Sequence, residues 1–270
     1  MASSVIPTWI GTPLNPAILG EIGALGAFPP VSIETPDTEE TRTYRIFSTS
    51  GYRDKTNQNQ GFFRMIRYPA ESDEPVQCHF LRKVLNADGV VQITTVDANC
   101  RSDALLSPIS WVYQNEFEDG EGNSLKSLET SETARVNHGE LHILRMGRLY
   151  KTTIPHPFTT DWCLLGSVPH LGNPIETPFD LYESFIKRKS SYRIAQGGTV
   201  DFQWDTQSIQ TKVFYLTGAG SLPYEYYVDS SQRILLVIMG CLVLILDPLA
   251  EEKCTQRIEA LRAQILEKQP

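Results

Sequence analysis

Two stretches of the chain hold the residue types that most often carry chemistry. The first is the hexapeptide NHGELH, in which His138, Glu140 and His142 alternate. Side chains alternate along a strand, so these three would share one face, and two imidazoles with a carboxylate can bind iron, manganese or zinc. The alternative is that Asn137-His138-Gly139 forms a tight turn followed by a solvated strand face. A metal site would need further ligands from other strands, so we predict no metal or other cofactor and keep the three residues as an outside candidate.

The second stretch, residues 152–172, combines two proline-flanked histidines with an aspartate, a tryptophan and a cysteine. A His and an Asp that reach one cleft can act as general acid and base. Cys163 beside a histidine could be a nucleophile, but its apolar neighbours favour a buried thiol. The alternative is an ordered connection between two halves of a barrel, with Trp162 in the core. The residues predicted for acid/base work are His142, His156, Asp161 and Tyr226.

Aromatic residues are frequent along the chain and could line an apolar cavity. Small-ligand sites are usually built in this way, from apolar walls with a few polar groups. An arginine on a neighbouring strand would supply the polar end for an acidic ligand. Plain core packing is the alternative. The residues predicted to contact a ligand are Trp111, Tyr113, Arg145, Trp162, Tyr192 and Trp204.

Composition narrows the class of protein. The chain has 270 residues and a formal charge of −8, which suits a large globular domain and disfavours nucleic acid as a partner. Five cysteines without a Cys-x-x-Cys motif argue against zinc knuckles and favour reduced thiols in a cytoplasm. The N-terminus lacks the basic region of a signal peptide, so we expect a cytoplasmic protein or a leader already removed. No glycine-rich phosphate loop is present.

From Thr41 onward, short runs rich in β-branched and aromatic residues alternate with turn signals. This pattern predicts about eleven or twelve strands joined by hairpin loops. In the heptapeptide TVDFQWD, from Thr199 to Asp205, apolar and polar residues alternate, which indicates one buried face and one wet face. Consecutive hairpins imply an antiparallel meander that closes as a barrel or stacks as a curved sandwich. The predicted turns include Asn86–Gly89, Asn137–Gly139 and Gly197-Gly198.

The most apolar run, Ile234–Leu246, has no polar side chain. It is too short to cross a membrane as a helix, which takes about 20 residues. We predict one strand bent at Gly240, or two short strands, buried on both faces. The helix predicted over 249–268 would cover one of these faces, with Asp247 as its N-cap. Its apolar stripe is formed by Cys254, Ile258, Leu261 and Ile265.

Residues 214–238, FYLTGAGSLPYEYYVDSSQRILLVI, carry a resemblance to a known kind of domain. The segment resembles the closing hairpins of uncharacterised bacterial β-barrel domains of lipocalin-like type. In those domains a strand ending in Thr-Gly is followed by Leu-Pro, an aromatic strand, an Asp-led turn and a final apolar strand. The resemblance implies an antiparallel barrel. It implies no activity and no site residue.

Together these patterns predict a mainly β protein, an antiparallel β-barrel or curved β-sandwich over 41–247. An extended N-terminal arm (1–40) precedes it and one amphipathic helix (248–270) packs on it. The leading hypothesis is a barrel that binds a small, largely apolar or aromatic metabolite, extended by cofactor-free isomerase, cyclase or lyase chemistry. The alternative is a non-enzymatic interaction module that builds a homo-oligomer through the arm and the helix. We expect no nucleic-acid partner and no membrane span.

Overall fold

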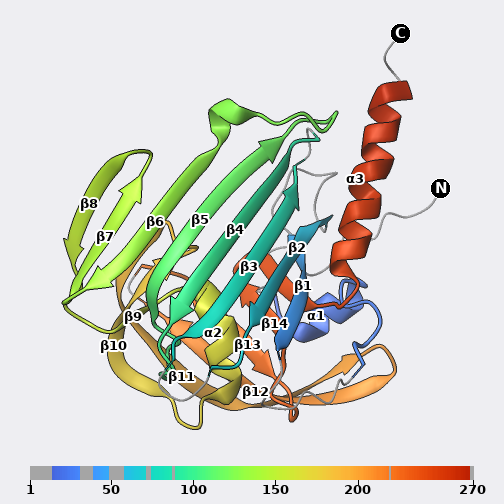
Figure 1. Cartoon of the computed structure of the whole chain (residues 1–270). Coiled ribbons are helices and arrows are strands. Elements are labelled where there is room, and N and C mark those ends of the chain that lie inside the picture. The colour runs from blue at the N-terminus through green and yellow to red at the C-terminus, as the bar shows by residue number, and fades with distance from the viewer. Residues whose placement is uncertain are drawn as a thin grey trace.

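One curved β-sheet dominates the fold (Figure 1). The computed structural model describes residues 14–30, 39–48, 58–70, 74–86, 89–218 and 220–267, and every structural statement below concerns these residues. Eight strands form the first half of the sheet. They are β1 (Glu40–Ser48), β2 (Gln58–Arg67), β3 (Val76–Leu85), β4 (Val91–Cys100), β5 (Pro108–Glu118), β6 (Thr130–Asn137), β7 (Glu140–Arg145) and β8 (Arg148–Thr153).

Seven strands form the second half, and three helices accompany the sheet. The strands are β9 (Phe158–Thr159), β10 (Ile175–Glu183), β11 (Lys187–Trp204), β12 (Gln207–Thr217), β13 (Tyr224–Val228), β14 (Ile234–Met239) and β15 (Leu242–Leu246). The helices are α1 (Pro16–Glu21), α2 (Asp161–Ser167) and α3 (Ala250–Glu267), and two 3-10 turns are η1 (Lys126–Leu128) and η2 (Val168–His170). This architecture confirms the predicted mainly β class, with an antiparallel curved sheet and a C-terminal helix.

The first and last strands pair with each other. β1 and β15 run antiparallel, from Tyr44 opposite Leu246 to Ser48 opposite Leu242. From β1 the chain adds one neighbouring strand after another as far as β8, which is one edge of the sheet. It then crosses to β9 at the other edge and continues through neighbouring strands back to β15, beside β1. All neighbours are antiparallel except β9 and β10. A twisted open sheet of this size must curl, because beyond about ten strands it seldom stays open.

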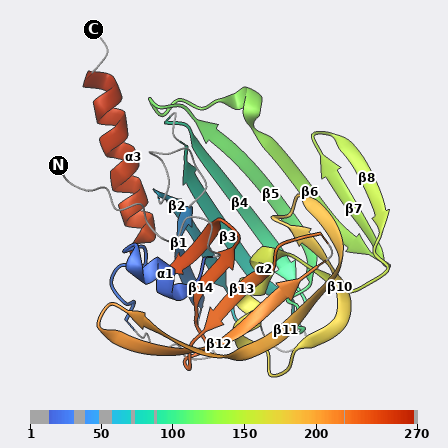
Figure 2. The same cartoon turned by 180° about the vertical axis from the view of Figure 1, so that it is seen from behind.

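Helix α2 fills the hollow of the curled sheet. All seven of its residues are buried, and in Figures 1 and 2 it lies between the wall of β2 to β6 and the strands β10 to β14. The sequence predicted this region as an ordered connection between two halves of a barrel, with Trp162 in the core, and the structure confirms both points. The helix itself was not predicted, because a helix of about two turns that is buried on all sides shows no apolar periodicity.

A single arginine joins the two edges of the sheet, at the open seam between β8 and β10. Arg188 of β11 donates two hydrogen bonds to Oδ2 of Asp180, at 2.9 and 2.6 Å. Its third nitrogen donates to the carbonyl oxygen of Thr153 in β8, at 2.8 Å. Asp180 is buried, so its charge depends on this partner. The seam is therefore held by side chains where the backbone ladder stops.

One turn prediction was wrong. Gly197-Gly198 is not a hairpin turn, because β11 runs through it without a break. The two glycines lie where the β11–β12 register shifts, between Gln196 and Thr199, so they accommodate a bulge. A turn that was not predicted separates β7 from β8 at Met146 and Gly147, which both have positive φ.

The apolar run forms the two short strands β14 and β15, which turn at Gly240 (φ 66°). Both faces are buried, as predicted. The prediction that the C-terminal helix covers one face was wrong. Helix α3 packs on β1 and β2 instead, as Figure 1 shows, and its apolar stripe lies against Phe62, Leu85 and Val91. Phe62, Leu85 and Val91 form an apolar cluster separate from the main core, and α3 shields this cluster from water.

Residues 14–30, part of the predicted N-terminal arm, belong to the packed body. Leu19 and Leu25 are buried in the main core. The indole nitrogen of Trp204 donates to the Gly26 carbonyl at 3.1 Å, and Arg233 donates to the Pro30 carbonyl at 2.8 Å. The rest of the predicted arm, apart from its last two residues, lies outside the described residues. Within the described chain, each helix is too short or too polar to span a bilayer.

The hydrogen bonds of Arg188 at the seam lead us to expect a loss of stability when this residue is replaced. Replacing Arg188 with Ala would leave the buried Asp180 charge unpaired, so we expect a loss of about 3 kcal/mol in the free energy of unfolding. Urea denaturation measures it. Lys187→Ala, an exposed neighbour on the same strand, is the matched control and should change stability by less than about 0.5 kcal/mol. The double variant Arg188→Met/Asp180→Leu should recover part of the loss. Equal effects of Arg188→Ala and Lys187→Ala would contradict the role of the seam.

Candidate functional site

A cavity of about 250 Å³ lies inside the curled sheet, beside α2. Both halves of the sheet contribute to it. Its apolar wall consists of Ile46, Phe63, Val237, Met239, Leu242 and Leu244. Its polar wall consists of Arg82, Asp161, Glu183, Ser184, Tyr224 and Tyr226. The partly exposed Tyr224, Met239 and Leu242 lie at one end of their strands and form the mouth, while the fully buried Leu244 and Phe63 lie deeper.

A larger hollow of about 710 Å³ lies between residues 25–30 and the first turns of α3. Its charged groups already have partners within the protein. Asp247 accepts from Lys253 at 2.9 Å and lies 3.6 Å from Arg45, and Arg257 also has a partner. The hollow therefore offers a mainly apolar surface on which the charged groups are already paired. The inner cavity is the stronger candidate site because it brings both kinds of group together.

Asp161 is the first residue of α2, and its carboxylate holds the turn between β10 and β11. The amide of Ser184 donates to its Oδ1 at 2.6 Å, and the Ser184 hydroxyl lies 3.3 Å from Oδ2. Burial raises the pKa of Asp161 to about 6, and the Ser184 hydrogen bonds limit that rise. Near neutral pH the group can therefore hold or release a proton, as an acid/base residue requires.

The turn that Asp161 holds is strained and buried. Ser184 and Phe185 both have positive φ, at 50° and 58°, a conformation that costs roughly 1–3 kcal/mol for each residue that is not glycine. The cost is offset by the Phe185 ring, which is fully buried against Phe80, Trp111 and Trp162 at centroid distances of 5.4–5.9 Å. Aromatic packing thus fixes one wall of the cavity.

Glu183 carries the second carboxylate, and its charge is compensated locally. Its Oε1 accepts from the Tyr224 hydroxyl at 2.7 Å and from the Lys189 ammonium at 2.9 Å. Burial acts to raise the pKa of Glu183, but these hydrogen bonds outweigh it and hold the pKa below its usual value. Glu183 is therefore ionised and neutralised by Lys189, which leaves little capacity for a ligand.

Arg82 is the cation of the cavity. It lies on the inward face of β3, in line with the buried Cys78, Phe80 and Val84. Burial lowers its pKa, while the nearby Tyr113 and Asp161 act to raise it. Among the described residues its guanidinium takes part in no hydrogen bond or ion pair. A half-buried guanidinium without a partner can bind an acceptor group from outside the chain.

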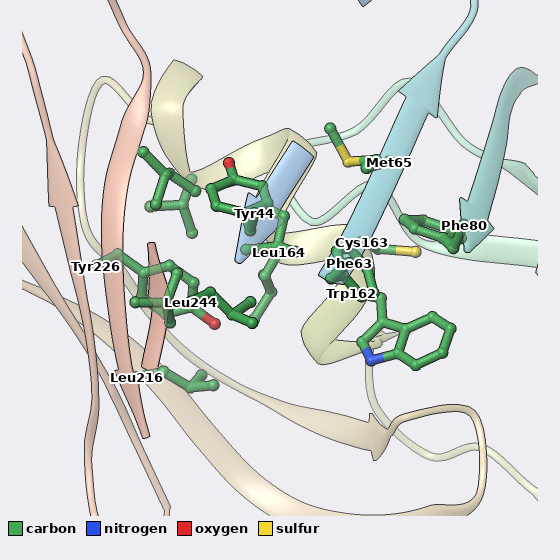
Figure 3. Close-up of a cluster of buried hydrophobic side chains, with 14 of the residues drawn as sticks. Tyr44, Phe63, Met65, Phe80, Trp162, Cys163, Leu164, Leu216, Tyr226 and Leu244 are labelled. Carbon is green, nitrogen blue, oxygen red and sulfur yellow. The ribbon is translucent and has the colours of Figure 1, made fainter. Parts of the chain in front are cut away.

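Tyr226 and Trp162 complete the cavity. Burial raises the pKa of Tyr226 well above its usual value, and the Asp161 charge adds to this, so its hydroxyl stays protonated. Trp162 packs edge-on against Phe63 with centroids 5.0 Å apart. Figure 3 shows these two rings together, with Tyr226 and Leu244 on the opposite side of the cluster. The site thus has one rigid aromatic wall and one hydroxyl donor.

Three of the residues predicted from sequence as acid/base or ligand contacts line this cavity, namely Asp161, Tyr226 and Trp162. The other two acid/base candidates lie elsewhere. His156 is exposed, and the His142 ring contacts Glu140 at 3.1 Å on the β7–β8 side of the sheet. Cys163, considered as a nucleophile, is fully buried with its sulfur 3.9 Å from that of Cys100.

The remaining predicted ligand contacts lie outside the cavity, four of them in the apolar core and Arg145 partly exposed. Trp111 and Arg145 both donate to the buried Glu132, at distances of 2.5–2.9 Å. The Tyr192 hydroxyl lies 2.7 Å from that of Ser221. The residues that belong to the main apolar core are Trp111, Tyr113, Tyr192 and Trp204. None of these, nor Arg145, lines the cavity.

The outside metal candidate does not assemble in the described structure. His138 adopts φ 46° and Gly139 φ 81°, so Asn137-His138-Gly139 is the turn between β6 and β7, as the alternative interpretation predicted. Glu140 and His142 lie on one face of β7, in contact with each other. Across the described ranges, the His, Cys, Asp and Glu side chains form no cluster of three that could hold a metal ion.

Four polar residues of the cavity were not predicted: Arg82, Glu183, Ser184 and Tyr224. The sequence carries a signal for Arg82. Positions 76, 78, 80 and 84 are apolar and alternate along β3, and the arginine interrupts them on the same face. A charge on an inward face indicates a buried partner or a ligand. The other three carry no such signal, because Glu183 and Ser184 reach the cavity through the β10–β11 turn and Tyr224 through the start of β13.

Comparisons with known proteins assign this chain to no family. Family models give no match, and a search of curated proteins also finds none. Among solved structures, the chain is similar to a beta-barrel-like protein of a domain of unknown function (DUF1849) from Brucella abortus. The two share 9% identity and a TM-score of 0.46, over 77% of this chain and 94% of that one. A similarity this distant carries no inference about function, and the barrel-like architecture here rests on the sheet itself.

The position of Asp161 predicts a pH effect on stability. Its pKa rises from the usual 3.8 to about 6 in the folded state, so the native protein holds this proton more tightly than the unfolded chain does. The resulting stabilisation is complete below about pH 4 and is lost as the pH rises through 6. We expect Asp161→Asn to gain up to about 3 kcal/mol relative to wild type between pH 4 and 7.5.

Urea denaturation of both proteins at pH 4.5 and 7.5 measures this difference. Asn keeps an acceptor for the Ser184 amide, so the turn itself is preserved. A relative stability that stays constant with pH, or that changes in the opposite direction, would show that Asp161 ionises normally in the folded protein.

Proposed function

We propose that this protein binds a small, largely apolar ligand in the cavity beside α2. The observation that carries the proposal is the division of the cavity into an apolar wall from β1, β2, β14 and β15 and a polar wall from β3, α2, β10 and β13. This division is typical of sites that bury an apolar body and orient it through a few polar groups. The ligand would enter past Tyr224 and Met239 with its apolar part toward Leu244.

The volume limits the ligand to a compact molecule. A space of about 250 Å³ corresponds to about eight waters of the liquid, and it lies at or just below the lower end of known ligand pockets. A chain of eight carbons or a bicyclic aromatic ring is of suitable size. The fixed aromatic wall around Trp162 and Phe185 favours a preformed site that needs little rearrangement on binding.

Acid/base chemistry is the natural extension of this proposal. Asp161, with its pKa of about 6, and the neutral Tyr226 hydroxyl line the same space, as isomerase, cyclase or lyase chemistry would require. The interaction-module alternative has less support, because residues 14–30 are committed to the core rather than free to dock.

Isothermal titration calorimetry with 1-octanol and indole tests the proposal. We expect both neutral probes to bind the wild-type protein. Val237→Phe places a ring in the cavity and should weaken binding at least about tenfold. The matched control is Val112→Phe, the same substitution at a 43% exposed position of β5, which should bind as wild type does. Circular dichroism checks that both variants fold.

Either of two results would count against the site. One is the absence of binding of both probes to the wild-type protein. The other is equal binding by wild type and a folded Val237→Phe variant, which would place the probes elsewhere, for instance in the hollow beside α3.

A further inference from the structure

We propose that the ligand of this cavity is a monocarboxylate, whose carboxylate is bound by Arg82 and Tyr226 while Asp161 takes up a proton. The inference rests on the proposed function and names the chemical class of its ligand. It starts from the polar wall, where the donors and acceptors of each group can be counted. The groups that surround Asp161 are Arg82 of β3, Glu183 of β10, Ser184 of the turn, Lys189 of β11, and Tyr224 and Tyr226 of β13.

Most of these groups are already used within the protein. Glu183 accepts from Tyr224 and Lys189, which removes all three from the set of free partners. Ser184 donates its amide, and directs its hydroxyl, to Asp161. Arg82 and Tyr226 are the two that remain, since neither side chain makes a hydrogen bond or ion pair within the described residues. Both are donors, and Arg82 is also a cation.

A guanidinium with a hydroxyl beside it is complementary to a carboxylate. Arginine presents two parallel N–H groups that match the two oxygens of a carboxylate, and the pair is among the stronger hydrogen-bonding arrangements in proteins. The Tyr226 hydroxyl, which stays protonated, can donate a further hydrogen bond. The apolar wall opposite would then hold the rest of the ligand. A fully apolar ligand would leave the N–H groups of Arg82 without a hydrogen-bond acceptor in a partly buried site.

Charge balance explains why the ligand should carry a single negative charge and why a proton accompanies it. Lys189 neutralises Glu183, so the empty cavity holds one cation, Arg82, and one ionisable acid, Asp161. A bound carboxylate would give two negative groups beside one positive group. Two carboxyl groups that share a site bind a proton between them, because both cannot stay ionised. Proton uptake by Asp161 restores neutrality, whereas a dianion would exceed the available positive charge.

The chemistry is one of reversible binding and proton transfer, and its balance is simple. The ligand enters as an anion, one proton comes from water or buffer, and the Asp161 carboxylate becomes a carboxylic acid. In this form Asp161 is itself a donor toward the ligand. Because the free group has a pKa of about 6, uptake should approach one proton per ligand at pH 7.5 and fall toward zero below pH 5. Affinity for the carboxylate should therefore weaken as the pH rises above 6.

Octanoate and 1-octanol are the matched probes, since they differ only in the head group. We expect calorimetry at pH 6.5 to give at least about tenfold tighter binding of octanoate by the wild-type protein. Arg82→Met should abolish this preference and change octanol binding by less than twofold. Arg82→Lys keeps the charge but loses the paired N–H groups, so it should retain only part of the preference.

Titrations in buffers of different ionisation enthalpy count the protons. We expect about one proton taken up per octanoate at pH 7.5 by wild type, and none by Asp161→Asn, whose octanoate affinity should not change between pH 6 and 7.5. A wild-type protein that binds octanoate without proton uptake would overturn the role given to Asp161.

The outcomes separate this inference from the proposed function. Equal binding of octanoate and octanol by both wild type and Arg82→Met would overturn the carboxylate assignment and leave the cavity as a binding site for neutral ligands. Loss of both probes in Val237→Phe, together with loss of octanoate alone in Arg82→Met, would support both. If neither probe binds wild type, the proposed function fails and the carboxylate assignment fails with it.

Discussion

The structure depends on one constraint: the concave face of a long, curled sheet is apolar and must be covered by other parts of the chain. Pairing of β1 with β15 joins the two halves of the meander into fifteen strands in one described sheet, and its concave face is apolar on both sides of that pair. Water in this space would remove most of the hydrophobic stabilisation, so α2 and the Phe185 turn occupy it instead. The strained φ of Ser184 and Phe185 persists because the surrounding aromatic rings leave that turn no other packed position.

The same constraint accounts for the cavity. A seven-residue helix fills the hollow only in part, and the space left over lies between its N-terminal turn and the strands β13 to β15. Polar groups line this space because the ends of α2 and of the β10–β11 hairpin carry backbone groups that need partners. Asp161 meets that need at Ser184. Arg82 is not the partner of any such backbone group among the described residues. This difference is why we propose Arg82 as a ligand-binding residue and Asp161 as one that also holds the turn.

Elsewhere in the fold, buried charges have structural partners. Arg188 and Asp180 hold the open seam, Arg145 and Trp111 bind Glu132, and Arg233 is paired with Asp229 at 2.8 Å. Arg188 joins strands that the backbone ladder leaves apart, Arg233 fixes the turn at Asp229, and Glu132 ties the side chains of the neighbouring strands β5, β6 and β7 together. Buried ionic groups without a partner are costly, and proteins keep them for function more often than for stability. Within the described chain, Arg82 is half-buried near the Asp161 carboxylate but makes no hydrogen bond to another residue, which sets it apart from the paired arginines.

The sequence by itself determined the class of the fold, most of its strands and its C-terminal helix. Alternating apolar residues and turn glycines located most of the strands. The apolar stripe that begins at Cys254 located the C-terminal helix. The apolar run Ile234–Leu246 is too short to form a membrane-spanning helix. The sequence also drew attention to Asp161, Trp162 and Tyr226, since their types can do chemistry. These are local properties, set by side-chain period and by backbone preference at turns.

Only the tertiary structure decided which of these residues meet. Trp111, Tyr192 and Trp204 have the same residue types as the cavity residues but lie in the core, because a strand's pattern specifies its buried face and not what that face contacts. Gly197-Gly198 carries a turn signal, yet β12 pairs with β11 both before and after the two glycines and keeps β11 continuous. Arg82 and Asp161 are far apart in sequence, and they share a cavity only because the sheet curls around α2. That curvature comes from twist summed over many strands, which no single segment encodes.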